Sequence, residues 1–151
     1  MPQLSLQSPI GPLTVSEEDG RIVSLDWGWG RDQSETVLLR RARDRLQDYF
    51  DGTTEGFDDL PLDPPGSVFQ RRVWDALRQI PWGGTRTYAD LARTVGSAPR
   101  AIGQAMARNP IPIIIPCHRV LATGGLGGYS GGEGLATKTW LLTLEGRALL
   151  V

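Results

Sequence analysis

The residues that could do chemistry lie together at Cys117, His118 and Arg119, which place a nucleophile, a base and a cation side by side. A thiolate is a strong nucleophile, but a thiol near neutral pH is little ionised and needs a base, a cation or a helix N-terminus to lower its pKa. Adjacent residues of a strand point to opposite faces, so His118 would act on Cys117 through a turn or a bridging water. From these residues alone, the alternative is an inert buried cysteine beside a hydrogen-bonded histidine.

The chain has one cysteine and one histidine among its 151 residues. One cysteine cannot form an internal disulfide, so the fold does not depend on oxidation. A structural zinc site takes about four cysteine or histidine ligands, which these two residues cannot supply. We therefore expect no bound metal, and Cys117 is either a small buried hydrophobe or a chemical group.

The segment before Cys117 must lead the chain into the core. Residues 109–116 read NPIPIIIP, which is too rich in proline for a helix interior and apolar enough to require burial. This run predicts that Cys117 and His118 are delivered into the core. After them, residues 121–134 contain seven glycines and predict a flexible loop, and residues 140–145 are expected to form a final helix.

Residues 87–108 predict two short helices in front of that run. Thr87 can cap the first helix, and Gly96 can end it. Pro99 suits the first turn of the second helix, which reaches about Arg108. Two short helices joined by a few residues that include glycine are typical of a helix-turn-helix, although many such pairs never contact DNA.

The first thirty residues predict a small antiparallel sheet. Apolar residues alternate with polar ones over residues 4–6 and 13–15, and the strand pattern resumes over 22–27. The dipeptide at 19–20, Asp-Gly, is a hairpin signal between the last two strands.

A helix is expected on each side of a linker. Residues 33–51 have one apolar face, with Asp32 and Glu35 at the spacing of a capping box. Residues 52–66 are rich in Gly, Asp and Pro and are expected to form the linker. The second helix begins after Ser67, which has a capping-box glutamine three residues later, and it ends before the next proline. The predicted fold class is α+β.

The two parts of the chain differ in charge. Residues 1–66 carry six arginines against thirteen acidic residues, a net of −7, and residues 67–151 carry nine arginines and one lysine against four acidic residues, a net of +6. We place a domain boundary at this change, with a structural domain over 1–63 and a second domain over 64–151. An acidic part joined to a basic part indicates that the basic part meets a polyanion, with two differently charged solvated faces as the alternative.

The composition is that of an ordinary globular protein, with 40% hydrophobic and 22% charged residues. No segment resembles a signal peptide, and none approaches the roughly 20 apolar residues of a membrane span. We therefore expect a soluble cytoplasmic protein, associated with the nucleoid when it is bound to DNA if the source is bacterial.

The segments around Cys117 carry a resemblance to a known family. They are Asn109-Pro110, Ile115-Pro116-Cys117-His118-Arg119-Val120, Gly127-Gly128-Tyr129-Ser130-Gly131-Gly132, Lys138, Trp140-Leu141-Leu142 and Glu145-Gly146. In this order they resemble the O6-alkylguanine-DNA alkyltransferase family over residues 67–146, and the resemblance is looser over 1–66. It implies a ribonuclease H-like sheet with a helix, followed by a mainly helical DNA-binding and alkyl-transfer domain with a helix-turn-helix and the active-site cysteine.

The resemblance implies catalytic roles for five residues. Cys117 matches the alkyl acceptor, His118 matches the residue that relays its proton through a water, and Glu145 matches the carboxylate that orients the histidine. Asn109 matches the residue that holds the turn beside the active-site strand, and Tyr88 matches the residue that helps turn the nucleotide out and protonates the guanine. The alkyl group would leave O6 of guanine for sulfur once per molecule, because the thioether is stable, and no cofactor would be needed.

The resemblance also implies a partner, which is double-stranded DNA carrying O6-alkylguanine, with O4-alkylthymine as a second candidate lesion. The O6 carbon of a paired base cannot reach a buried cysteine unless the nucleotide leaves the helix. Arg100 matches the finger that fills the stack, and the DNA-binding set is completed by Tyr88, Ala101, Gln104 and Arg108. The substrate pocket is expected to contain Met106, Val120, Tyr129, Ser130 and Gly131. The protein is expected to act as a monomer.

Some features and alternatives stay open at this point. The segment between Ser130 and Lys138 is longer than the family spacing, with residues 133–134 as the insertion, so the size of alkyl group accepted is open. Taken singly, Tyr88 could be a core aromatic, Arg100 a solvated helix residue, and Glu145 a partner of Arg147. Two other functions are alternatives. One is an alkyltransferase-like lesion sensor, which typically has Trp where this chain has Cys117. The other is a cysteine hydrolase, which would need an oxyanion hole.

Overall fold

The computed structural model describes residues 1–53 and 56–146. Contacts within the chain group it into two compact units, Met1–Pro65 and Gly66–Val151. Within the described residues, every helix is too short or too polar to cross a membrane.

The first unit contains a three-stranded antiparallel sheet in the order β1-β2-β3, with strands β1 (Gln3–Leu6), β2 (Leu13–Glu18) and β3 (Arg21–Trp27). Leu4 pairs with Val15, which pairs with Leu25, so apolar residues of all three strands share one face. At the β2–β3 turn, Asp19 and Gly20 both have positive φ, 52° and 75°, as the mirror-image turns of tight hairpins require. The three predicted strands and their hairpin are therefore confirmed.

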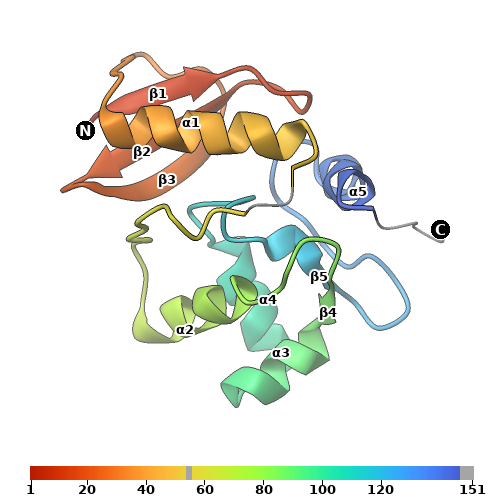
Figure 1. Cartoon of the computed structure of the whole chain (residues 1–151). Coiled ribbons are helices and arrows are strands. Elements are labelled where there is room, and N and C mark those ends of the chain that lie inside the picture. Colours follow the sequence, from red (N-terminus) through yellow and green to blue (C-terminus); the bar gives the residue numbers. More distant parts are fainter. Residues whose placement is uncertain (54–55, 147–151) are drawn as a thin grey trace. The chain divides into compact units, whose positions relative to one another are not determined.

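Helix α1 (Val37–Phe50) packs on β1 and β2 and closes the core of this unit (Figure 1). It begins after Thr36, whose side chain accepts from the Leu39 N–H at 3.1 Å, so the predicted start at 33 and the capping role of Asp32 and Glu35 are wrong. The reason is tertiary. Gln33 accepts from the Ser5 N–H at 2.9 Å, and the Ser34 N–H donates to the Gln3 carbonyl at 2.7 Å, so this segment is tied to β1 before the helix can begin.

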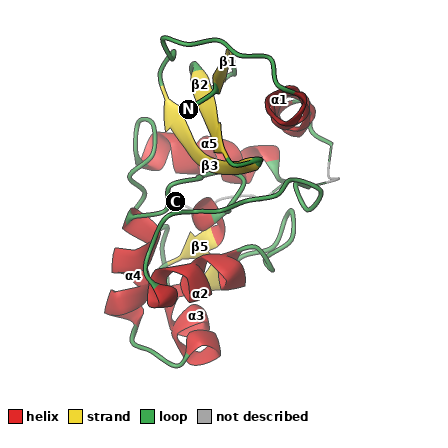
Figure 2. Cartoon of the chain, turned by 90° about the vertical axis from the view of Figure 1, so that its left-hand side faces the viewer, coloured by secondary structure: helices red, strands yellow, loops and turns green. Residues whose placement is uncertain are grey.

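The second unit is built on helices α2 (Val68–Leu77), α3 (Tyr88–Val95) and α4 (Pro99–Ala107), which pack on one another (Figure 2). The predicted capping box begins α2, Thr87 caps α3, and Gly96 ends α3 with φ of 78°, as the sequence predicted. Asp90 completes a capping box at α3 that the sequence analysis did not name. The indole N–H of Trp74 in α2 donates to the carbonyl of Ala105 in α4 at 2.9 Å. Helices α3 and α4 also pack on each other, which confirms the helix pair that the sequence predicted.

The remaining elements are the short helix that contains Cys117, two short strands and the last helix. Strands β4 (Arg86–Thr87) and β5 (Val120–Leu121) pair in parallel, the 3-10 helix η1 (Cys117–Arg119) precedes β5, and α5 (Leu135–Leu144) follows the glycine-rich loop. Helix α5 begins five residues before the predicted start at 140, because its first turn is held by contacts that no apolar pattern reveals. The Glu133 N–H donates to the Thr137 hydroxyl at 2.9 Å, and the Lys138 side chain is buried.

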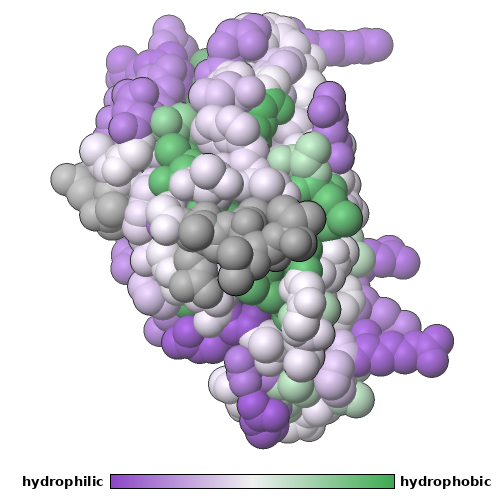
Figure 3. Space-filling model, turned by 90° about the vertical axis from the view of Figure 1, so that its right-hand side faces the viewer, coloured by the Kyte–Doolittle hydropathy of each residue, from purple (hydrophilic) through white to green (hydrophobic). Residues whose placement is uncertain are grey.

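Exposed large apolar residues are scattered along the described chain rather than clustered in sequence; they are Met1, Trp29, Val37, Val68 and Leu135. On the face seen in Figure 3, hydrophilic side chains project from the surface and hydrophobic residues occupy the areas between them. Exposed apolar residues of this kind are normal for a globular protein and carry no functional argument.

Candidate active site

The turn before Cys117 is held by Asn109. The Asn109 Nδ2 donates to the Ile115 carbonyl at 2.9 Å, and its Oδ1 accepts from the Ile111 N–H at 3.0 Å. Between these bonds Ile113 has a φ of 73°, in the left-handed region that a β-branched residue rarely adopts. The asparagine therefore holds a strained turn directly before the cysteine.

Cys117 is buried at the start of η1 rather than in an extended strand, so the opposite-face geometry of adjacent strand residues does not apply to it and His118. Burial raises the pKa of the Cys117 thiol, and a hydrogen bond from Asn109 and the charge of Lys138 oppose that rise only in part. The thiol is therefore protonated near neutral pH and needs a base to become a nucleophile.

His118 is fully buried and meets Glu145, with 2.6 Å between Nε2 and Oε2. Burial raises the pKa of Glu145, but hydrogen bonds and charge from His118 and Arg119 outweigh burial and lower this pKa to about 2. The carboxylate is therefore ionised and accepts the Nε2 proton. Burial lowers the pKa of His118 more than its hydrogen bond and charge interaction with Glu145 raise it, so near pH 7 the ring is neutral and its Nδ1 carries a lone pair. Among the described residues, Nδ1 has no hydrogen-bond partner, which leaves it available as a base.

Arg119 shares Glu145 with His118. Its Nε donates to Glu145 Oε1 at 2.8 Å, its Nη2 donates to Oε2 at 3.1 Å, and its Nη1 donates to the Ile80 carbonyl at 2.6 Å. The sequence had suggested Arg119 as a cation acting on Cys117, but its guanidinium is bound to the carboxylate instead. The other suggested partner of Glu145, Arg147, lies outside the described residues.

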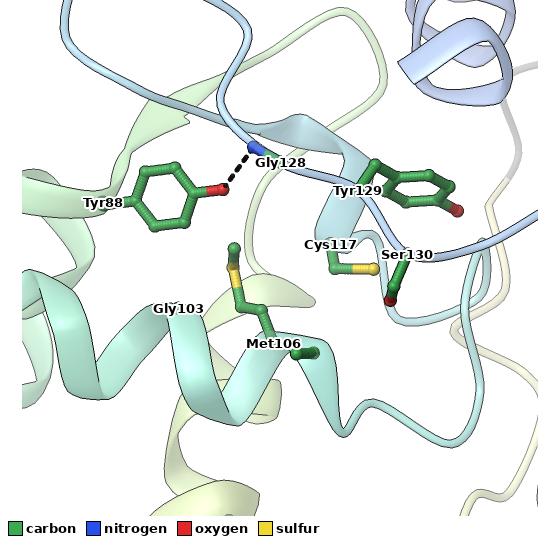
Figure 4. Close-up of a pocket in the computed structure, with 8 residues that line it drawn as sticks. Tyr88, Gly103, Met106, Cys117, Gly128, Tyr129 and Ser130 are labelled. Atoms are coloured by element: carbon green, nitrogen blue, oxygen red, sulfur yellow. Dashed lines mark hydrogen bonds between the residues drawn. The ribbon is translucent and has the colours of Figure 1, made fainter. Parts of the chain in front are cut away.

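Cys117 opens into a cavity of about 270 Å³ (Figure 4), lined by Tyr88, Gly103, Met106, Ala107, Cys117, Gly128, Tyr129 and Ser130. Of the predicted pocket residues, Met106, Tyr129 and Ser130 line it, whereas Val120 and Gly131 are not among its lining residues. Val120 is fully buried behind the loop, where its carbonyl accepts from Lys138. Apolar walls with a few polar groups around one thiol suit a flat, partly polar ligand such as a nucleobase.

Tyr88, the first residue of α3, forms one wall of this cavity. Its hydroxyl oxygen accepts from the Gly128 N–H at 3.3 Å, as drawn in Figure 4, so its own proton is free for a ligand. A Cβ on Gly127 would lie 2.8 Å from the Tyr88 ring, and one on Gly103 would lie 3.9 Å from it. Only glycine therefore lets the loop approach the ring closely at Gly127.

Apart from Tyr88 on α3, the residues predicted to contact DNA lie on α4 or, for Arg108, directly after it. Arg100 is exposed in the first turn of this helix and is not among the lining residues of the cavity. Ala101, Gln104 and Arg108 line a separate groove of about 720 Å³ beside the start of α2, where Ser67 and Gln70 also lie. The structure therefore places Arg100, Ala101 and Gln104 on α4, whose Met106 lines the cavity of Cys117.

Lys138 is a polar residue of this centre to which the sequence gave no role, and Arg119 is one whose predicted role differs from its contacts. Both are buried, and both bind groups distant in sequence. The available signal was that Lys138 is the only lysine in a chain with 15 arginines. In the described part of the chain, no three His, Cys, Asp or Glu side chains are grouped so that they could hold a metal ion.

Two family models match the chain. Residues 4–64 match the 6-O-methylguanine DNA methyltransferase, ribonuclease-like domain, and residues 68–147 match the 6-O-methylguanine DNA methyltransferase, DNA binding domain. The predicted α+β fold, with a ribonuclease-like first part, is thereby confirmed.

Curated relatives and solved structures agree. The methylated-DNA–protein-cysteine methyltransferase of Metallosphaera sedula is 42% identical over 146 residues, covering 95% of this chain and 92% of that protein. The constitutive methylated-DNA–protein-cysteine methyltransferase of Bacillus subtilis is 42% identical over 153 residues, covering 92% of each chain. A crystal structure of Mycobacterium tuberculosis OGT in complex with DNA has a TM-score of 0.85 at 39% identity, covering 96% of this chain and 92% of that one. The chain therefore belongs to the 6-O-methylguanine DNA methyltransferase family.

Proposed function

We propose that this chain repairs DNA by moving an alkyl group from O6 of guanine onto Sγ of its own Cys117, once per molecule. It is a methylated-DNA–protein-cysteine methyltransferase, a DNA repair alkyltransferase. The observation that carries the assignment to Cys117 is that the only thiol of the chain opens into a base-sized cavity beside a neutral, Glu145-oriented His118.

In the proposed reaction the proton of the Cys117 thiol passes to His118 Nδ1 through a bridging water, and Glu145 stabilises the imidazolium that forms. Sulfur then displaces guanine from the alkyl carbon, so that an S–C bond forms as the C–O6 bond breaks. The Tyr88 hydroxyl donates its proton to the guanine ring, which makes guanine a better leaving group, and proton exchange with solvent then restores the Tyr88 hydroxyl and neutral His118. The product thioether is stable, so the protein is consumed.

The lesion must leave the duplex to reach this cavity. We propose that Arg100 enters the base stack in its place and that Ala101, Gln104 and Arg108 hold the flanking DNA. Met106, Tyr129 and Ser130 would pack around the flipped base. Val120 and Gly131 would contribute through their backbone, since Val120 is not among the residues that line the cavity and glycine has no side chain.

The proposal is tested on the DNA product. A duplex with a single O6-methylguanine is incubated with excess and with limiting protein, digested to nucleosides and analysed for restored guanine. One guanine per wild-type molecule, and none with Cys117→Ala, is the expected result. Restoration by Cys117→Ala, or several guanines per molecule, would overturn the proposal.

A further inference from the structure

Lys138 is the only lysine of the chain, and it is fully buried. From α5 its Nζ donates to three backbone carbonyls, those of Val120 at 2.6 Å, Leu126 at 2.6 Å and Gly128 at 3.0 Å. An ammonium group has three N–H donors, so each donor has one acceptor. A buried charge is tolerated only when it is hydrogen-bonded in this way, so the burial of Lys138 requires the three carbonyls to keep their places.

The three carbonyls belong to the segment that joins Cys117 to the pocket wall. Val120 directly follows η1, and Gly128 lines the cavity beside Tyr129. The intervening residues 121–127 include three glycines and have little side-chain packing of their own to fix them. One buried side chain therefore ties both ends of this loop to α5.

The charge of Lys138 also acts on the reactive groups. Burial raises the pKa of Cys117, and the charge of Lys138 opposes that rise. Burial lowers the pKa of His118, and the charge of Lys138 lowers it further. Burial lowers the pKa of Lys138 to about 8, and a thiolate at Cys117 opposes that shift. The other ionisable groups at this centre are Tyr129 and the mutually bound pair Arg119 and Glu145. Ammonium and thiolate therefore favour each other, and the same ammonium favours the neutral form of His118 that accepts the thiol proton.

We propose that Lys138 is a positioning residue for alkyl transfer, which fixes the pocket loop through three carbonyls and whose ammonium charge favours the thiolate form of Cys117. The part of this proposal that concerns alkyl transfer rests on the proposed function. The electrostatic part concerns the thiol alone, so it can be tested without DNA. A residue that only supported the fold would leave the ionisation of Cys117 unchanged.

The test compares wild type with Lys138→Met and Lys138→Arg, all checked for folding by thermal unfolding. The rate of Cys117 alkylation by iodoacetamide is measured against pH, and the reaction with free O6-benzylguanine is measured in parallel. Below pH 8, where the Lys138 ammonium is still charged, Lys138→Met should lower the rate of Cys117 alkylation by about tenfold and slow the benzyl transfer by about tenfold or more. Lys138→Arg keeps the charge but not the three-carbonyl geometry, so its thiol profile should return toward wild type while the transfer stays slow.

An unshifted thiol profile in folded Lys138→Met would overturn the proposal. If Lys138→Met does not fold, an NMR titration of Lys138 in the wild-type protein tests the proposal instead. Labelling with 13Cε-lysine gives a single NMR signal, which should titrate near pH 8. A midpoint at the ordinary lysine value would equally overturn it. Failure of the DNA test with a shifted thiol profile would instead count against the proposed function alone.

Discussion

A buried thiol is a poor nucleophile until a base removes its proton. At the residue scale, His118 is that base for Cys117, and its contacts hold it in a single neutral tautomer. Glu145 is ionised between His118 and Arg119, so the imidazole proton is fixed on Nε2 and the lone pair on Nδ1. Arg119 has the larger share of this carboxylate, with two of its nitrogens bound to it. The centre therefore depends on a carboxylate that serves both fold and chemistry.

Glu145→Gln is expected to lower both the stability of the fold and the rate of alkyl transfer. The lowered pKa of Glu145, about 2 against 4.5 for the free group, contributes stability that is fully present above pH 4.5 and is lost as the pH falls toward 2. Over that range the free energy of unfolding of wild type should fall by on the order of 3 kcal/mol more than that of Glu145→Gln. Urea denaturation at a series of pH values measures the difference, and parallel curves for the two proteins would contradict it.

At the element scale, the loop after β5 and helix α3 fit together through one glycine. A Cβ at position 127 would lie 2.8 Å from the Tyr88 ring and 3.2 Å from the Ala122 nitrogen, and Gly127 has a φ of 73°. Gly127→Ala should therefore destabilise the protein by about 1–3 kcal/mol and slow the reaction with O6-benzylguanine by displacing Tyr88. Gly125→Ala is the matched control, because nothing lies within 4 Å of a Cβ there. Equal effects of the two substitutions would refute this account of the loop.

Helix α4 carries the proposed contacts that matter for a duplex and not for a free base. Arg100 is exposed in its first turn and away from the cavity residues. Arg100→Ala should therefore slow repair of O6-methylguanine in duplex DNA by about tenfold or more and leave reaction with free O6-benzylguanine nearly unchanged. Arg93→Ala, which removes an equal charge from α3, is the control in the same rate measurements. Equal losses on both substrates would show that Arg100 does not act on the duplex.

The elements also show which parts of the fold can be predicted from sequence. The caps of α2 and α3 were predictable because Ser67 and Thr87 bind N–H groups three residues away. The start of α1 was not, because Gln33 is bound to β1, 28 residues earlier in the chain. Likewise Cys117 and His118 could be selected by type and spacing, whereas the roles of Arg119 and Lys138 depend on partners that only the fold brings near.

At the scale of the whole molecule, the positive charge lies in residues 67–151, with a net of +6, and the negative charge in residues 1–66, with a net of −7. DNA binding by the proposed face should therefore weaken as salt rises, because phosphate contacts release counterions. Arg108→Gln should reduce the slope of log affinity against log salt by about 0.9, the value for one phosphate contact. Arg40→Gln, which removes an exposed arginine from α1, should leave the slope unchanged. Fluorescence anisotropy at several salt concentrations measures both slopes, and an equal change in both variants would argue against a DNA face on α4.

The central claim, that Cys117 takes the alkyl group and keeps it, is tested most directly on the protein itself. Intact-protein mass spectrometry after incubation with excess O6-methylguanine duplex should show a gain of one methyl group that never exceeds one per molecule. Peptide mapping should place it on Cys117, and Cys117→Ala should gain nothing. An unchanged mass with tight binding to the lesion would contradict the claim and indicate a lesion sensor, and a methyl group on any other residue would contradict the assignment of Cys117.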